Sequence, residues 1–308
     1  MLGRGLVMFG FAKRKVRLAA GAGSARNELW TAGDVAAAID RMVLPFGGGN
    51  DVAKAYHRVF TKRYADTLNA LNGIDRNARV LELAAAPYGL TALLRSMRFT
   101  RIDLADFGAA DSPSKRVMVG IGDDVGEFVS TAFNVERDRW PWEDGSFDLV
   151  LACELVEHLA LDPMNLFAEA NRVLAPGGAL LVTTPNAASF QKLLKLVAMR
   201  PPGMAPHYRL PPTLESIYQR HNRELTPPAL EMLFVSAGFS LESRTILDSY
   251  PLDQCGLSES VISELAKLAL AYGERGDTMH FLGRKAGSVV ERYPTGEELY
   301  LASDVRRD

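Results

Sequence analysis

The chain contains little cysteine, little net charge and no long apolar run, and each shortage excludes a class of protein. Two cysteines among 308 residues, Cys153 and Cys255, form no disulfide framework, so we expect a reducing, cytoplasmic location. No run of roughly 18 or more apolar residues is present, which excludes a transmembrane helix. A formal net charge of −2 argues against non-specific electrostatic binding of nucleic acid. The composition, 47% hydrophobic and 23% charged, is that of an ordinary globular protein.

Apolar runs of strand length alternate with segments of helical periodicity in the central part of the chain. The predicted strands lie near 79–84, 101–105, 131–134, 147–152, 178–184, 241–248 and 277–284. The predicted helices between them lie near 89–97, 124–129, 162–174, 227–237 and 258–272. Such alternation implies right-handed crossovers and an α/β fold, with a mostly parallel sheet and helices on both faces.

Three further segments flank or interrupt this alternation. Residues 31–46 and 51–72 carry apolar residues at helical spacing, after a basic, Gly/Ala-rich start that we expect to be mobile. An insertion containing PPGMAPHYRLPP follows the fifth predicted strand, and it is our candidate substrate cap, because its prolines cannot continue a helix or a central strand. The chain therefore divides into an arm and helical cap over 1–72, a main domain over 73–288 with the insertion at 187–226, and a tail over 289–308.

The segment RVLELAAAPYGLT joins a predicted buried strand to a predicted helix. Val80, Leu81 and Leu83 are the apolar strand residues, and a helix is expected to begin near Gly89. In an open α/β sheet, ligands bind at this carboxyl end of the strands. A plain packing junction between strand and helix is the alternative interpretation of the same residues.

A second group of polar residues follows the fourth predicted strand, in CELVEHL. Glu154, Glu157 and His158 are three and four positions apart, which places them on one face of a turn. Two acids and a histidine can hold a divalent cation, or His158 can serve as a general base. Acids at the start of a helix are also favoured by its dipole, without any catalytic role. Far along the chain, RHNRELT adds a further histidine, His221, just before a predicted helix capped by Thr226.

RVLELAAAPYGLT, FDLVLACELVEHL and NRVLAPGGALLVTTPN, in this order, resemble the class I S-adenosylmethionine (SAM)-dependent methyltransferases. The resemblance implies a Rossmann-like sheet of seven strands, the last of them antiparallel. Family members carry glycines where this chain has Ala84 and Ala86. The cofactor-binding residues carried over by position are Glu82, Ala84, Ala86, Gly89, Asp106, Asn134 and Val135. Glu82 would attract the amino-acid end of SAM, Asp106 would accept the ribose hydroxyls, and Asn134 would contact the adenine edge.

CELVEHL and RHNRELT together resemble the metal-binding elements of small-RNA 2′-O-methyltransferases, which coordinate magnesium. The metal ligands implied are Glu154, Glu157, His158 and His221, with magnesium or manganese as the ion. The RNA substrate does not carry over, because the chain lacks a basic stripe or an RNA-binding module.

The sequence is also similar to methyltransferases of bacterial polysaccharide and glycoside modification. We therefore predict O-methylation of a small-molecule or saccharide hydroxyl, with His158 and Glu154 as the catalytic residues. Methylation of a nitrogen or carbon on a small metabolite is an alternative on the same fold. A second alternative is a non-catalytic relative whose Ala84 and Ala86 record the loss of SAM binding.

Overall fold

The sheet is built around strand β2 (Arg79–Leu83), which shows how the sequence pattern sets the layers. We describe a computed structural model over residues 29–47, 50–108, 114–203, 214–271 and 273–294. Successive side chains of a strand point to opposite faces. Val80 accordingly packs into one core, whereas Leu81 and Leu83 pack into a second core on the other side of the sheet.

The sheet of the described residues has nine strands in the order β1-β4-β5-β3-β2-β6-β7-β9-β8. The strands are β1 (Met42–Val43), β2, β3 (Arg101–Phe107), β4 (Lys115–Ile121), β5 (Asp124–Phe133), β6 (Phe147–Cys153), β7 (Leu174–Pro185), β8 (Phe239–Leu247) and β9 (Thr278–Lys285). The central strands pair in parallel, and β9 runs antiparallel to both β7 and β8. The predicted α/β class with a mostly parallel centre is confirmed, with two strands more than expected, β1 and β4.

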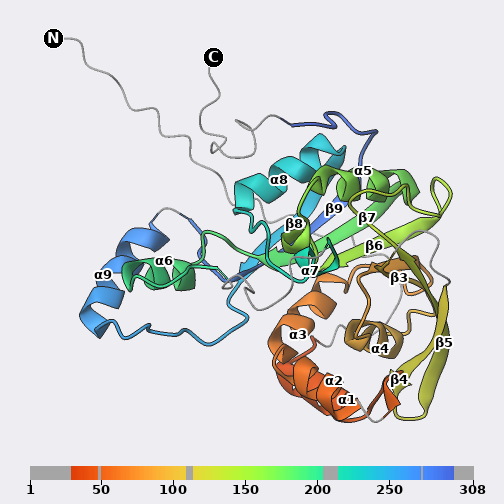
Figure 1. Cartoon of the computed structure of the whole chain (residues 1–308), viewed down its shortest axis with the longest axis horizontal. Helices are drawn as coiled ribbons and strands as arrows, with labels where there is room; N and C mark the ends of the chain where they lie inside the picture. The colour runs from red at the N-terminus through yellow and green to blue at the C-terminus, as the bar shows by residue number, and fades with distance from the viewer. Residues whose placement is uncertain (1–28, 48–49, 109–113, 204–213, 272, 295–308) are drawn as a thin grey trace.

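Helices cover both faces of this sheet (Figure 1). The helices are α1 (Ala32–Asp40), α2 (Asn50–Arg58), α3 (Thr61–Ala70), α4 (Gly89–Ser96), α5 (Pro163–Val173), α6 (Phe190–Val197), α7 (Leu214–Ile217), α8 (Pro227–Ser236) and α9 (Glu259–Leu270), with a 3-10 turn, η2 (Val156–His158). Helices α1, α3 and α4 contribute to the first core, and α5 and α8 contribute to the second. Helices α6 and α9 lie together, away from these layers (Figure 1).

The predicted helix over 124–129 is wrong, because this segment is the first part of strand β5. It forms a hairpin with β4, joined through Gly122 at φ +60°. Phe128 is buried toward the first core, while Glu127 and Val129 on either side of it are exposed. Gly-Asp is a turn pair found in hairpins, and here pairing with β4 and packing of Phe128 favour a strand over the short helical pattern.

Both predicted N-terminal helices are shorter than expected. The first ends at Asp40, and Met42 and Val43 form β1, which pairs with β4. The second divides into α2 and α3. The predicted single apolar face is therefore interrupted: Leu68 of α3 is fully buried, whereas Val52 of α2 is 76% exposed.

Part of the predicted substrate cap is tied to the turn that follows β6. The backbone N–H groups of Asn222 and Arg223 both donate to the carbonyl of Glu157. Thr226 is the N-cap residue of α8 and Pro227 its first residue, as predicted. Most of the proline-rich run, residues 204–213, lies outside the described residues, as do the start over 1–28 and the end over 295–308.

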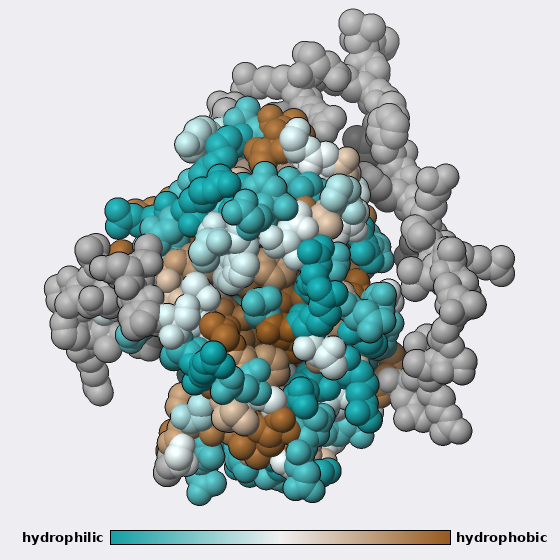
Figure 2. All heavy atoms as spheres, turned by 90° about the vertical axis from the view of Figure 1, so that its right-hand side faces the viewer, coloured by the Kyte–Doolittle hydropathy of each residue, from teal (hydrophilic) through white to brown (hydrophobic). Residues whose placement is uncertain are grey.

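Charged and hydrophobic residues are mixed on the face that carries the β4–β5 hairpin. Figure 2 shows hydrophobic residues lying between hydrophilic ones on this side of the molecule. Met118 and Val129 are among the exposed hydrophobic residues of the hairpin, and Arg116 and Glu127 form an ion pair across it. No helix in the described parts of the chain is long and apolar enough to cross a membrane.

Candidate active site

Glu82 lies near the carboxyl end of β2, where the fold places ligands. Its side chain accepts a hydrogen bond of 2.7 Å from the hydroxyl of Thr91 and is 3% exposed. Burial raises the pKa of Glu82 to about 8, because a carboxylate loses hydration there without gaining a cation. A cationic ligand group beside Glu82 would restore its charge. This environment therefore suits the amino-acid end of SAM.

Asp106 stands near the end of the neighbouring strand, β3, and already holds several donors. Its carboxylate accepts hydrogen bonds from Ala86 N at 2.8 Å, Tyr88 OH at 2.7 Å and Ser130 Oγ at 2.6 Å. Lys115 lies 3.3 Å away. Burial opposes the charged form, but the hydrogen bonds from Ser130, Tyr88 and Ala86 lower the pKa of Asp106 overall. Asp106 is thus a carboxylate held in place near the carboxyl end of β3. A carboxylate is a good hydrogen-bond acceptor for the two hydroxyls of a ribose.

The turn between β2 and α4 contains Ala84 and Ala86 where a glycine-rich loop would have glycines. Ala84 has φ +52°, a left-handed conformation that glycine adopts without cost, so alanine is strained there. The N–H of Ala86, two residues later, donates a hydrogen bond to the Asp106 carboxylate. Gly89 faces the ring of His57, and a Cβ on this glycine would lie 2.4 Å from His57 Cε1. His57 of α2 therefore packs directly on the turn.

The chemistry of these residues fits SAM, but the space beside them is small. The cavity between the turn and α2–α3 has a volume of about 100 Å³. Small-molecule sites typically occupy about 300–1,000 Å³. Its lining includes Glu82, Gly89, Tyr56, Arg63 and Glu154. Binding of a whole cofactor therefore requires side chains at this cavity to move.

Asn134 and Val135 lie after β5 and do not line this cavity or the larger one described below. The Asn134 amide donates to the hydroxyl of Tyr218 at 3.1 Å. Tyr218 in turn packs on Phe107, with ring centroids 4.8 Å apart. Asn134 thus joins the sheet edge to the insertion, and its predicted adenine contact stays a prediction.

Glu154 begins the turn after β6 and pairs with a cation that the sequence prediction missed. Its carboxylate accepts from Arg63 at 2.8 Å and from Thr183 at 3.0 Å, and its φ is +52°. Arg63 also donates to the hydroxyl of Tyr250 at 2.8 Å and lies 4.2 Å from the ring centroid of Phe60. The arginine therefore connects Glu154 with α3 and with the segment after β8.

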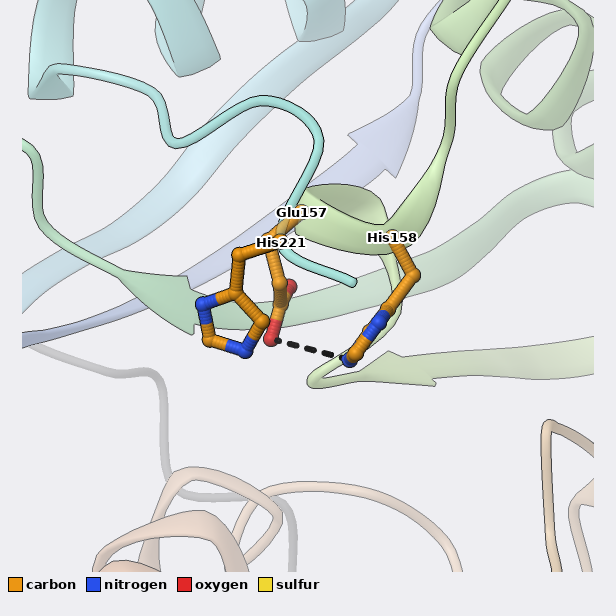
Figure 3. A group of neighbouring side chains, drawn as sticks. All are labelled: Glu157, His158 and His221. Carbon is orange, nitrogen blue, oxygen red and sulfur yellow. Dashed lines mark ion pairs between the residues drawn. The ribbon is translucent and has the colours of Figure 1, made fainter. Parts of the chain in front are cut away.

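Glu157, His158 and His221 come together, as the sequence pattern predicted. One ligand atom from each lies within 4.8 Å of the other two. Figure 3 shows the two imidazoles on either side of the Glu157 carboxylate, with His158 Nε2 at 4.0 Å from the nearer carboxylate oxygen. Glu154, the fourth predicted ligand, lies outside this group.

Nδ1 of each ring has a hydrogen-bond partner outside the group. His158 Nδ1 lies 3.0 Å from the carbonyl of Arg220, and His221 Nδ1 lies 2.9 Å from a Glu224 oxygen. An acceptor on Nδ1 makes that nitrogen the donor, so Nε2 carries the lone pair, as in ligating histidines. Burial and the neighbouring His221 lower the pKa of His158, which keeps its ring neutral at pH 7.

Thr184 and Glu224 complete this environment. The Thr184 hydroxyl donates to the other Glu157 oxygen at 2.8 Å. Burial and the nearby Glu154 charge raise the pKa of Glu157. Glu224 also pairs with Lys192, and its pKa is held at about 2: burial acts against this, but the bonds from His221 and Lys192 prevail. The group thus contains one carboxylate that gains from a bound cation and two imidazoles held in the right tautomer.

A large cavity opens beside these three residues, with a volume of about 1110 Å³. It is bounded by α3, α6, α9 and the segment after β8. Tyr56, Arg63 and Glu154 line both this cavity and the small one beside the β2 turn. The two cavities therefore adjoin at these residues, which lie between the predicted cofactor site and the Glu157–His158–His221 group.

Sequence reasoning missed His57, Arg63 and Tyr250, whose roles depend on tertiary contacts. Arg63 lies three residues after Phe60, but the sequence alone does not show that its side chain is buried. A buried arginine needs an acidic partner. That partner, Glu154, is far away in the sequence and could not be identified by spacing.

Comparison with known proteins identifies the family of the chain. Residues 55–244, more than half of the chain, match the family model described as a methyltransferase domain. A curated protein of Mycolicibacterium smegmatis, named "Probable S-adenosylmethionine-dependent methyltransferase", is 35% identical over 102 residues. That match spans 33% of this chain and 32% of the relative, about a third of its length.

Solved structures of similar arrangement include SAM-dependent methyltransferases of two other organisms. The protein of Archaeoglobus fulgidus has a TM-score of 0.47 at 13% identity, covering 75% of this chain and 98% of its own. The protein of Mesorhizobium loti has a TM-score of 0.41 at 15% identity, covering 68% and 91%. The family-model match spans the β2 turn, Asp106 and the turn after β6. The chain belongs to the family of class I SAM-dependent methyltransferases.

Proposed function

We propose that this enzyme transfers the methyl group of SAM to an acceptor hydroxyl, for which a sugar of a polysaccharide or glycoside is our first candidate. We also propose that Glu157, His158 and His221 bind a divalent cation, magnesium or manganese, that holds this hydroxyl. The observation that carries the proposal is the convergence of these three side chains on the wall of a large cavity adjoining the cofactor site.

The donor set supports a cation. Two atoms that share one ion at about 2.0–2.3 Å each lie at most about 4–4.6 Å apart. The 4.0 Å between Glu157 and His158 fits this limit, and the 4.8 Å bound on the whole group requires only small side-chain adjustments. Glu224 and the Arg220 carbonyl supply the outer hydrogen bonds that metal-ligating histidines usually have. A cation bound there would orient the hydroxyl and stabilise negative charge on its oxygen.

Other residues of the chain would bind the cofactor and remove the hydroxyl proton. Glu82 and Asp106 present negative charge to the amino-acid and ribose ends of SAM, which supplies an electrophilic methyl group on its sulfonium. Ala84 and Ala86 lie in the turn after β2, and Gly89 begins α4. Glu154, paired with Arg63, lies where the two cavities adjoin. His158 alone would act as the general base that takes the hydroxyl proton if no cation binds.

The test is methyl transfer from SAM carrying a ¹³C-methyl group, with a panel of glycosides as acceptors. The chemical shift of the transferred carbon distinguishes a methyl ether from methylation at nitrogen or carbon. We expect an ether, loss of activity with a chelator, and recovery with magnesium or manganese. His221→Ala should abolish the recovery while leaving SAM affinity within about twofold, because His221 does not line the cofactor cavity.

Two results would overturn parts of the proposal. A product methylated at nitrogen or carbon would refute O-methylation. Activity that resists the chelator and disappears only on His158 substitution would refute the cation and leave His158 as a plain general base.

A further inference from the structure

The large cavity has two ends of different chemistry. Glu157, His158 and His221 lie at one end, beside the junction with the cofactor cavity. The other end lies between α6, α9 and the segment after β8. Its apolar lining consists of Phe190, Pro251, Leu252, Ala266 and Leu270. Figure 1 shows that α6 and α9 stand together, away from the main layers, so this end projects from the body of the enzyme.

Most polar groups at the apolar end are already bonded to the protein. The Gln191 amide donates to the carbonyl of Asp253 at 2.9 Å and accepts from its N–H at 2.6 Å. The Asp253 carboxylate accepts from Cys255 N at 2.8 Å. Arg275 donates to the carbonyls of Ala188 and Ala269. These groups have little capacity left to bind the hydroxyls of a second or third sugar.

Lys195 of α6 and Asp248 of the segment after β8 are further charged side chains of this wall; Lys195 is partly buried and Asp248 is exposed. A lysine can lie with its methylenes along an apolar surface while its ammonium stays in water. Lys195 is therefore compatible with an apolar occupant.

The apolar end also continues onto the surface. Leu252 is 49% exposed and Leu270 is 61% exposed, although both line the cavity. A chain leaving the cavity along these leucines would remove their apolar surface from water, which is favourable in proportion to the area covered.

We propose, on the basis of the proposed function, that the acceptor is an amphiphile: a hydroxylated head at the Glu157 end, with an alkyl chain along Phe190, Leu252 and Leu270. The volume of about 1110 Å³ slightly exceeds the upper range of typical small-molecule sites, about 1,000 Å³, and leaves room for both parts.

The charges of the lining favour a neutral acceptor over an anionic one. Four cationic side chains line the cavity, Arg63, Lys192, Lys195 and Arg275, and six acidic ones, Glu154, Glu157, Glu224, Asp248, Asp253 and Asp277. A divalent cation would balance the excess of acids. No surplus of positive charge then remains for a phosphate or carboxylate, so recognition rests on the hydroxylated head and the apolar chain.

The experiment compares two probes with one head group, octyl β-glucoside and methyl β-glucoside, binding to the full chain. Binding is followed by saturation-transfer NMR below the micelle concentration of the octyl compound. We expect the octyl compound to bind at least about tenfold more tightly, as burial of only two methylenes would produce. Leu270→Ser should remove most of this preference, and Leu252→Ser should act in the same direction. Both leucines are exposed, so the variants should stay folded.

Val235→Ser is the matched control, because Val235 is 52% exposed on α8 but does not line the cavity. It should leave the preference unchanged. Equal binding of the two glucosides, no detectable octyl binding, or equal effects of Leu270→Ser and Val235→Ser would overturn the inference. The measurement needs no methyl transfer. An enzyme that keeps the octyl preference but forms no methyl ether would therefore contradict the proposed function and not the apolar subsite.

Discussion

Replacement of Gly89 by alanine should show why this position is glycine. A Cβ there would lie 2.4 Å from Cε1, 2.5 Å from Nδ1 and 2.7 Å from Nε2 of His57. The ring cannot easily move, because it is fully buried, with Nδ1 2.8 Å from the Tyr64 hydroxyl and Nε2 3.3 Å from the Pro87 carbonyl. Overpacking of this kind costs about 1–3 kcal/mol of unfolding free energy.

A double-mutant cycle separates this clash from other effects of the substitution. Urea unfolding should show that Gly89→Ala costs about 1–3 kcal/mol in the wild-type background. In the His57→Ala background the same change should cost less than about 0.5 kcal/mol, as is usual away from strained or tightly packed positions. An equal cost in both backgrounds would show that the His57 ring is not the reason for glycine at this position. The reason would then be the backbone conformation or contact with the cofactor. A parallel SAM titration would then identify which.

Three other substitutions test separate parts of the site. Asp106→Ala should weaken SAM binding by about 1.5–3 kcal/mol, the usual worth of hydrogen bonds to a charged group, measured by calorimetry; unchanged affinity would remove Asp106 from the cofactor site. Arg63→Met should lower the unfolding free energy by about 1–3 kcal/mol, because the partly buried Glu154 carboxylate loses its cation and keeps only the bond from Thr183, and adding Glu154→Gln should recover part of the loss; no recovery would mean that packing, not charge, dominates. His280 is buried with neither ring nitrogen bonded, and burial lowers its pKa to about 4. As the pH falls, His280 is therefore protonated in the unfolded chain before it is protonated in the folded protein. This difference should lower the unfolding free energy by about 3 kcal/mol between about pH 6.5 and about pH 4. His280→Leu should make the unfolding free energy less dependent on pH over this range.

The central strands could be predicted because their apolar residues are local signals. The apolar runs of β2 and β6 are typical of strands that are buried on both faces of a sheet; they include Leu81, Leu83 and residues 147–152. The β4–β5 hairpin was missed because its alternation is weak and Gly126 interrupts it. Only pairing with β4 and packing of Phe128 against the first core make the segment a strand.

The candidate site divides in the same way between local and tertiary information. Glu157, His158 and His221 were found because two short motifs match one known pattern, and the fold brings them together. Glu154 was assigned to the same ion because spacing alone cannot show that Arg63 pairs with it. The position of His57 on Gly89 depends on the direction of α2, which no sequence pattern specifies.

Glu157, His158 and His221 are proposed to hold one divalent cation at the acceptor end of the methyl-transfer site. Electron spin-echo spectroscopy of bound Mn²⁺ tests it directly, because nitrogen nuclei of coordinated imidazoles modulate the echo. With the demethylated cofactor product present, we predict one Mn²⁺ per chain coupled to two imidazole nitrogens, and one nitrogen fewer in His221→Ala. Mn²⁺ with no nitrogen coupling, or a spectrum that His221→Ala leaves unchanged, would contradict the account.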